Sequence, residues 1–218
     1  MDYLNTWLDA NIKDRKLFRK RTIICFLGVF GMGFFLSFLI MVGLGTDPAT
    51  FMNLSVAKRI GWTLGNWQLT ANIIMLILVI VFDRKIIGLG TIFNMVLIGY
   101  YADFFCWLWR KIPDQEALFT RGASRWIIFF IALLCFIVSA AIYMNAQSGL
   151  SPYDGLAKIL ANALPKIPFF LTRICYDFVA IGIGVLAGGK PTIGIILMAV
   201  GLGPVITLVG KKMEKILG

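Results

Sequence analysis

The sequence has no histidine and only four cysteines in 218 residues. The lack of histidine removes Ser-His catalysis, histidine-ligated metals and haem from consideration. The cysteines all lie within apolar runs and show no metal-like spacing, so we expect inert packing residues: Cys25, Cys106, Cys135 and Cys175. We therefore expect no cofactor and no metal.

Charged residues are also scarce, at 15% of the chain, whereas 59% of the residues are hydrophobic. The mean hydropathy is +0.85. A soluble domain cannot bury that much apolar surface, and the apolar residues fall in long runs. The composition therefore predicts an all-α membrane protein with several spans and no soluble domain.

Acidic residues number 11 against 21 basic ones, which gives a net charge of +10. The basic residues cluster at the ends of the apolar runs, as expected of topology determinants that meet anionic lipid headgroups. Nucleic acid is therefore not an expected partner, and the lipid bilayer is.

Six runs are long enough to cross ~30 Å of hydrocarbon, which takes ~17–25 helical residues. We expect the spans at about 22–44, 64–82, 86–108, 126–146, 169–188 and 192–209. Residues 1–21 mix apolar and basic side chains and predict an amphipathic helix on the cytoplasmic surface, with a disordered basic tail as the alternative. Residues 110–125 are expected to form an extracellular loop, and residues 211–218 a basic C-terminal tail.

Lys and Arg counts give the orientation. With the N-terminus inside, thirteen basic residues fall in the inner segments and seven in the outer segments. This bias favours a multi-pass membrane protein with both termini in the cytoplasm.

One break in hydropathy occurs twice. Gly-Leu-Gly-Thr-Asp-Pro ends at Pro48, and Gly-Leu-Ser-Pro ends at Pro152, which fixes an offset of 152 − 48 = 104. The same offset pairs Gly45 with Gly149 and, among other residues, Gly90 with Gly194, without a gap. We interpret residues 22–109 and 126–210 as two repeats. Because each repeat has three spans, the second should be inverted relative to the first, as in many transporters.

Each break should start a short helix that is too short to cross the membrane. Asp47 and Ser151 are suitable N-caps, each followed by proline, and Asp154 stands three residues after Ser151 as in a capping box. These helices could lie at the membrane interface, or could be re-entrant and point their N-termini into a shared cavity. In the second case they would hold a small solute of zwitterionic or vitamin-like chemistry.

Polar residues inside spans are the other candidates, because the bilayer penalises them. Arg173 and Asp177 are four residues apart and can pair on one helix face. The asparagines could instead bond between helices. The substrate-binding residues we predict are Thr46, Asp47, Asn66, Asn72, Asn94, Ser151, Tyr153, Asp154, Arg173 and Asp177. The sequence shows no catalytic constellation, so we do not expect an enzyme.

The motifs at 43–48, 88–91 and 151–156 together resemble those of the YczE/YitT-like family of small bacterial membrane proteins. The resemblance covers nearly the whole chain and implies a protein of the bacterial cytoplasmic (inner) membrane; it brings no catalytic residues to carry over. Many members have an arginine after the second proline, where this chain has Tyr153.

The six-span plan is also similar to the membrane substrate-binding subunits of energy-coupling-factor vitamin importers. Those subunits dock through small residues of the first span, a role that Gly28, Gly31 and Gly33 could fill here. Two functions follow as hypotheses. One is a small-solute transporter, or the substrate-binding subunit of an importer served by an energising module. The other is a non-transporting helper that docks a partner protein or anionic lipid.

Overall fold

The computed structural model describes residues 15–217, apart from the side chains of residues 207 and 213–217. This part of the chain is helical and contains no strand. Its elements are α2 (Arg15–Val42), α3 (Pro48–Ile60), α4 (Leu64–Asp83), the 3-10 helix η1 (Arg84–Ile86), α5 (Leu89–Trp109), α6 (Gln115–Thr120), α7 (Gly122–Asn145), α8 (Pro152–Ala163), α9 (Phe169–Leu186) and α10 (Ile193–Leu217).

Six of the described helices are long and apolar enough to cross a membrane: α2, α4, α5, α7, α9 and α10. They confirm the predicted number and order of spans. Large apolar side chains stay exposed on their outer faces; Val81 on α4 is 71% exposed and Leu186 on α9 is 81% exposed. Such exposure is costly in water but favourable against lipid, so the protein is a multi-pass membrane protein.

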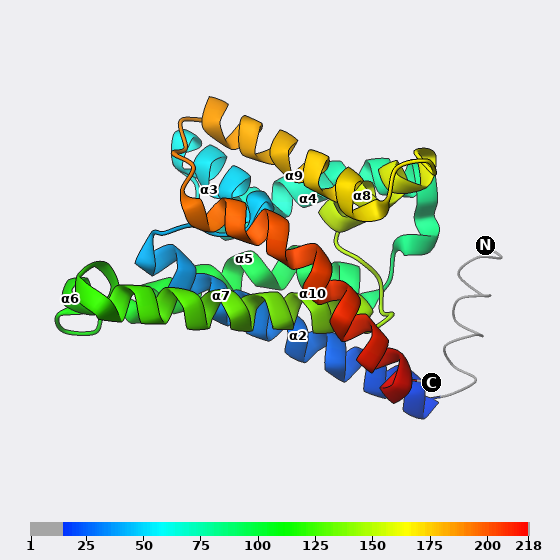
Figure 1. The fold of residues 1–218 in the computed structure, drawn as a ribbon, viewed down its shortest axis with the longest axis horizontal. Helices are drawn as coiled ribbons and strands as arrows, with labels where there is room; N and C mark the ends of the chain where they lie inside the picture. Colours follow the sequence, from blue (N-terminus) through cyan, green and yellow to red (C-terminus); the bar gives the residue numbers. More distant parts are fainter. Residues whose placement is uncertain (1–14, 218) are drawn as a thin grey trace.

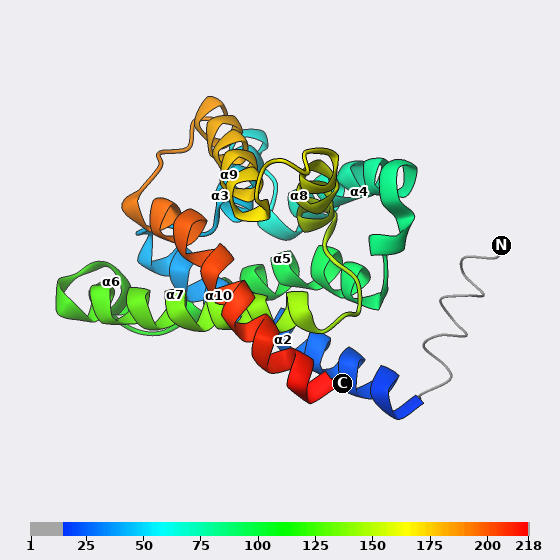
Figure 2. The ribbon, with the colours of Figure 1, turned by 45° about the vertical axis from the view of Figure 1, so that its right-hand side comes forward.

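The helices form two layers that meet at the centre of the molecule (Figure 1). In one layer α2 packs between α5 and α7, and α10 packs on α7. In the other, α3 packs on α9 and α4 packs on α8. Figure 2, turned by 45°, shows the same separation. The packing thus pairs each short helix with a span from the other half of the chain.

The two short helices begin as predicted. The side chain of Asp47 accepts a hydrogen bond from the Thr50 N–H and caps α3, with Pro48 as the first helical residue. Ser151 caps α8 by accepting from the Asp154 N–H, and Pro152 follows it. The two caps satisfy N–H groups that a helix start leaves without an intrahelical partner.

Backbone hydrogen bonds join the two halves reciprocally. Gly90 N–H donates to the Ser148 carbonyl at 2.7 Å, and Gly194 N–H donates to the Leu44 carbonyl at 3.1 Å. Both pairs of positions obey the sequence offset, since 194 − 90 = 104 and 148 − 44 = 104. The reciprocity supports the repeat, while the inverted orientation of the second repeat across a bilayer stays a prediction.

Glycine is needed where the halves touch. Gly149 has φ +103°, and a Cβ there would lie 2.5 Å from Gly88 N. Gly45, at the matching position, has φ +132°, and its Cβ would lie 2.7 Å from Ile195 N. A side chain at either position would separate the two backbones.

The predicted segments outside the spans fit the helices as follows. Residues 1–14, most of the predicted amphipathic helix, lie outside the described residues, and α2 already begins at Arg15. The predicted loop at 110–125 contains α6 and the start of α7. Helix α10 continues through the predicted C-terminal tail to Leu217. The start of α2 and the end of α10 lie at the same end of the molecule (Figures 1 and 2).

The predicted docking glycines on α2 face inward. A Cβ on Gly28 or Gly31 would meet α7 at Tyr143 or Ser139, and one on Gly33 would meet Tyr101 of α5. The glycine face of α2 therefore packs against α7 and α5 of the same chain, because small residues allow helices to approach closely. A helper that docks a partner would have to use another surface.

Candidate functional site

A cavity lies where the two short helices begin, at the junction of the layers. Its wall includes residues from α2, α3, α4, α5, α7, α8, α9 and α10. Two apolar pairs in the wall, Met32 with Phe136 and Ile98 with Leu202, occupy positions related by the repeat offset. The wall thus draws on both halves. Its polar members are Asp47, Thr50, Asn53, Gln68, Asn72, Asn94, Tyr143, Ser151, Tyr153, Asp154 and Arg173.

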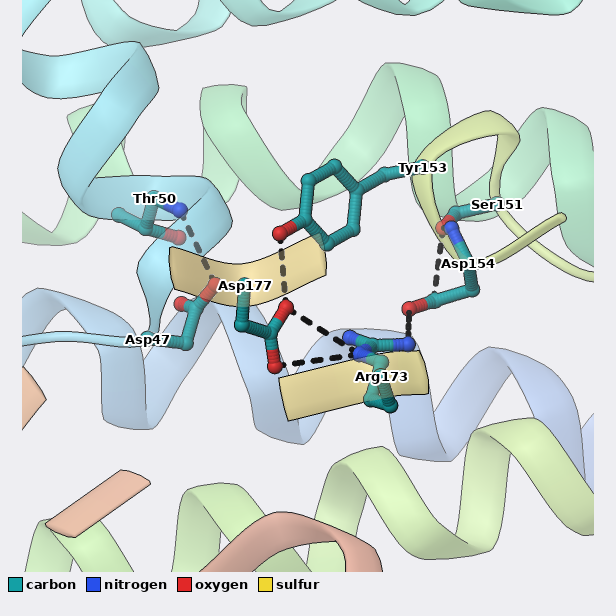
Figure 3. Close-up of polar contacts among 7 residues, drawn as sticks. All are labelled: Asp47, Thr50, Ser151, Tyr153, Asp154, Arg173 and Asp177. Atoms are coloured by element: carbon teal, nitrogen blue, oxygen red, sulfur yellow. Dashed lines mark hydrogen bonds and ion pairs between the residues drawn. The ribbon is translucent and has the colours of Figure 1, made fainter. Parts of the chain in front are cut away.

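One side of this central cavity holds a buried ionic network (Figure 3). Arg173 Nη1 donates to Asp154 Oδ1 at 2.7 Å, and Arg173 Nε donates to both carboxylate oxygens of Asp177 at 3.2 Å. Tyr153 Oη donates to Asp177 Oδ1 at 2.8 Å, and Ser151 Oγ donates to Asp154 Oδ2 at 2.7 Å. The predicted pair of Arg173 and Asp177 is therefore confirmed, and it extends to the start of α8.

Asp47 faces the same cavity from the start of α3 (Figure 3). Its Oδ1 caps the helix by accepting from Thr50, and its Oδ2 has no hydrogen-bond partner within the described part of the chain. Burial raises the pKa of the Asp47 carboxyl above its usual value, the bond from Thr50 opposes the shift, and repulsion from Asp177 and Asp154 adds to it. The cavity therefore contains a second acidic centre, separate from the arginine network.

Four buried polar atoms in the wall lack a hydrogen-bond partner among the described residues. They are Asp47 Oδ2, Asn53 Oδ1, Gln68 Oε1 and Tyr143 Oη. Their residues are 9%, 4%, 7% and 0% exposed, respectively. A buried polar group without a partner costs free energy, and native structures contain few of them. Their convergence on one cavity indicates a place for a polar ligand or for water.

The cavity is small. About 60 Å³ of it is open to the centres of water-sized molecules. On this measure one buried water needs ~10–15 Å³. The space therefore accepts a few waters, or a solute with only a few non-hydrogen atoms.

Most of the predicted binding residues come together here. Seven of them line the cavity: Asp47, Asn72, Asn94, Ser151, Tyr153, Asp154 and Arg173. An eighth, Asp177, lies directly behind Arg173. Two others do not line it. Thr46 is buried and donates to the Asp47 carbonyl at 3.3 Å. Asn66 is exposed and accepts from Tyr100 Oη at 3.0 Å in a separate hollow beside Trp62.

The sequence reasoning missed several wall residues: Thr50, Asn53, Gln68 and Tyr143. Gln68 could have been found, because it is four residues before Asn72 and so shares its helix face. Asn66 is six residues before Asn72 and points elsewhere. Asn53 lies six residues after its N-cap in α3, and no sequence signal separated Tyr143 from an ordinary core tyrosine.

The arrangement is suited to binding through charge and hydrogen bonds. Among the described residues, no group of three His, Cys, Asp or Glu side chains is placed to hold a metal ion. What converges instead is a set of four amide side chains and the Tyr143 hydroxyl around two acidic centres: Asn53, Gln68, Asn72 and Asn94 are the amides.

The fold and this site together define an integral membrane protein with a polar cavity buried between its helices. The chain belongs to the family of unknown function DUF6198, which it matches over residues 19–211.

Two curated relatives come from Bacillus subtilis strain 168. The chain is 27% identical to the uncharacterized protein YyaS over 153 residues, which is 69% of this chain and 73% of the relative. It is 28% identical to the uncharacterized membrane protein YczE over 119 residues, which is 55% of this chain and 52% of that relative. These matches confirm the YczE-like resemblance. No solved structure matches the chain.

Proposed function

We propose that this protein binds a small solute in the central cavity and carries it across the bacterial cytoplasmic membrane. The observation that carries the proposal is the set of four buried polar atoms without partners around one cavity. A structural polar cluster would satisfy its own members, as Arg173 and Asp154 do, because unpaired buried groups are costly. A ligand that enters the cavity would supply the missing partners.

The position of the cavity supports transport rather than simple storage. Both halves contribute to its wall, and the start of one short helix from each half faces it. In transporters built from inverted repeats, the site lies between the repeats and is formed by broken helices, and rocking of one repeat against the other opens it to alternate sides. We propose this mode of action here, with both termini in the cytoplasm.

The test is solute flux into vesicles. We would reconstitute the full chain into liposomes and follow the uptake of labelled glycerol, glycine, lactate and ethylammonium, which represent neutral, zwitterionic, anionic and cationic solutes. The cavity-filling variant Ala49→Phe puts a ring into the wall, and Ala117→Phe puts the same ring on the exposed surface of α6.

We expect at least one solute to enter faster than into empty vesicles, with the rate lost in Ala49→Phe and kept in Ala117→Phe. If no solute enters faster, or if Ala49→Phe has no effect, transport through the cavity is refuted. Co-purification of a stoichiometric partner protein together with absent flux would instead support the helper function.

The partner we propose besides the solute is anionic lipid at the basic start of α2. A hollow there is lined by Lys16, Arg19 and Lys20 together with Ile23 and Ile24. Basic side chains next to an apolar surface suit a headgroup and its acyl chain.

A further inference from the structure

The charges of the cavity are unbalanced. Its acidic groups are Asp47, Asp154 and, directly behind the wall, Asp177, whereas Arg173 is the one basic side chain in the described wall. When all four are ionised, two negative charges stay uncompensated. A buried charge without a counterion is costly in a membrane protein, so these carboxylates favour a positive partner.

Arg173 has little left to offer an anion. Its Nε and Nη1 are committed to Asp177 and Asp154, and its guanidinium lies 5.3 Å from the centre of the Tyr153 ring. Its side chain is 9% exposed. An anionic ligand that bound the remaining Nη2 group would share the guanidinium with both carboxylates, whose negative charge would repel it. The arginine therefore holds the two carboxylates in place and does not act as an anion receptor.

The four wall atoms without partners also favour a ligand that donates hydrogen bonds. Asp47 Oδ2 accepts when the carboxylate is ionised, and Asn53 Oδ1 and Gln68 Oε1 are carbonyl oxygens that also accept; Tyr143 Oη can accept or donate. A ligand rich in N–H groups satisfies this set, whereas a carboxylate or phosphate does not. Aromatic side chains in the wall, Phe136 among them, are compatible with an ammonium group.

We propose that the solute is a compact organic ammonium ion, with one positive charge, several N–H donors and only a few non-hydrogen atoms. This inference rests on the proposed function, since it names the chemical class that the transport site takes. Asp47 Oδ2 receives an N–H of the ammonium group, and the amide oxygens of Asn53 and Gln68 receive others. The network of Arg173, Asp154 and Asp177 adds a net negative charge at the same cavity.

The test measures binding, so that its outcome is independent of transport. The probe is ethylammonium chloride, added to the purified full chain in detergent while the midpoint of thermal unfolding is followed. Sodium chloride, potassium chloride, sodium acetate, glycine and urea are the comparison solutes. Because affinity per non-hydrogen atom is limited, a three-atom ligand is expected to bind only in the millimolar range or more weakly.

Asp47→Asn is the decisive variant, because asparagine caps a helix as well as aspartate does and keeps α3 intact. Asp103→Asn is its matched control: it removes the same charge outside the cavity, where Asp103 accepts from the Gly65 N–H. We expect ethylammonium to stabilise the parent more than sodium chloride does at equal concentration. Its apparent affinity should fall about 10- to 100-fold in Asp47→Asn and change less than about twofold in Asp103→Asn.

The inference is overturned if acetate or glycine stabilises the parent more than ethylammonium does, if sodium or potassium binds and ethylammonium does not, or if Asp47→Asn leaves ethylammonium binding unchanged. Flux of glycerol, glycine or lactate without ethylammonium binding would refute the cationic substrate and leave transport standing. Ethylammonium binding without any flux would uphold the ligand class and refute transport.

Discussion

Arg173 Nη1 lies 2.7 Å from Asp154 Oδ1, so that an ion pair joins α9 to the first turn of α8. Both side chains are nearly buried, and the same guanidinium also holds Asp177 on its own helix. The start of α8 is thus fixed by a charge that comes from the following span. This contact gives the cavity its acidic wall.

The first prediction concerns this ion pair. Arg173→Met should lower the free energy of unfolding by about 3 kcal/mol or more, because it leaves two buried carboxylates without a counterion. Chemical denaturation in detergent measures the change. The exposed Arg121→Met should cost less than about 0.5 kcal/mol. Adding Asp154→Asn and Asp177→Asn to Arg173→Met should recover part of the loss; equal losses in both single variants would contradict the ionic account.

The second prediction concerns the contact between the halves. Gly149→Ala should destabilise the protein by about 2 kcal/mol or more, because alanine is strained at φ +103° and its Cβ would meet the backbone of Gly88. Gly61→Ala is the control, since Gly61 has φ +75° but nothing within 4 Å of the added Cβ. Its cost should be only the backbone strain, about 1 kcal/mol. Similar unfolding midpoints for the two variants would show that the halves do not pack closely here.

The third prediction concerns pH. Asp47 must be ionised to pair with ethylammonium, and its raised pKa means that protons compete at a higher pH than for an exposed aspartate. The ligand itself stays charged, because alkylamines such as lysine have a pKa of ~10.4. The affinity for ethylammonium should therefore fall as the pH is lowered from about 8 to about 5. In Asp47→Asn this dependence should flatten; an equally steep profile would assign the titration to another group.

The fourth prediction concerns topology. In a cysteine-free background, single cysteines at Lys85 and Lys166 should react with a membrane-impermeant maleimide only after the cells are opened. A cysteine at Lys111 should react in intact cells, because the Lys and Arg counts place the 110–125 segment outside. If the cysteines that replace Lys85 and Lys111 were labelled from the same side of the membrane, the predicted order of spans would be refuted.

The sequence was sufficient for much of the fold because its signals are local. Hydropathy located the spans, and Asp47 and Ser151 with their following prolines marked the starts of α3 and α8. The offset between Pro48 and Pro152 paired Gly90 with Gly194, and the structure shows that each of these two glycines donates to the other half of the chain. These features depend on neighbouring residues or on a repeat, and both can be read from one chain.

The site was harder to predict because its composition depends on which helix faces turn inward. Asn66 and Asn72 look equivalent in sequence, yet one lies in an outer hollow with Tyr100 and the other in the central cavity. The spacing of Gln68 and Asn72 could have separated them. The inclusion of Asn53 and Tyr143 could not be foreseen, because it follows from tertiary packing between distant helices.

The same pair of asparagines gives the most direct test of the account. We would compare Asn72→Ala and Asn66→Ala, the same change on one helix, for ethylammonium binding and for ethylammonium uptake into vesicles. The central cavity predicts that Asn72→Ala weakens both by at least about tenfold and that Asn66→Ala changes neither by more than about twofold. Equal effects of the two variants, or a larger effect of Asn66→Ala, would contradict a solute site in the central cavity.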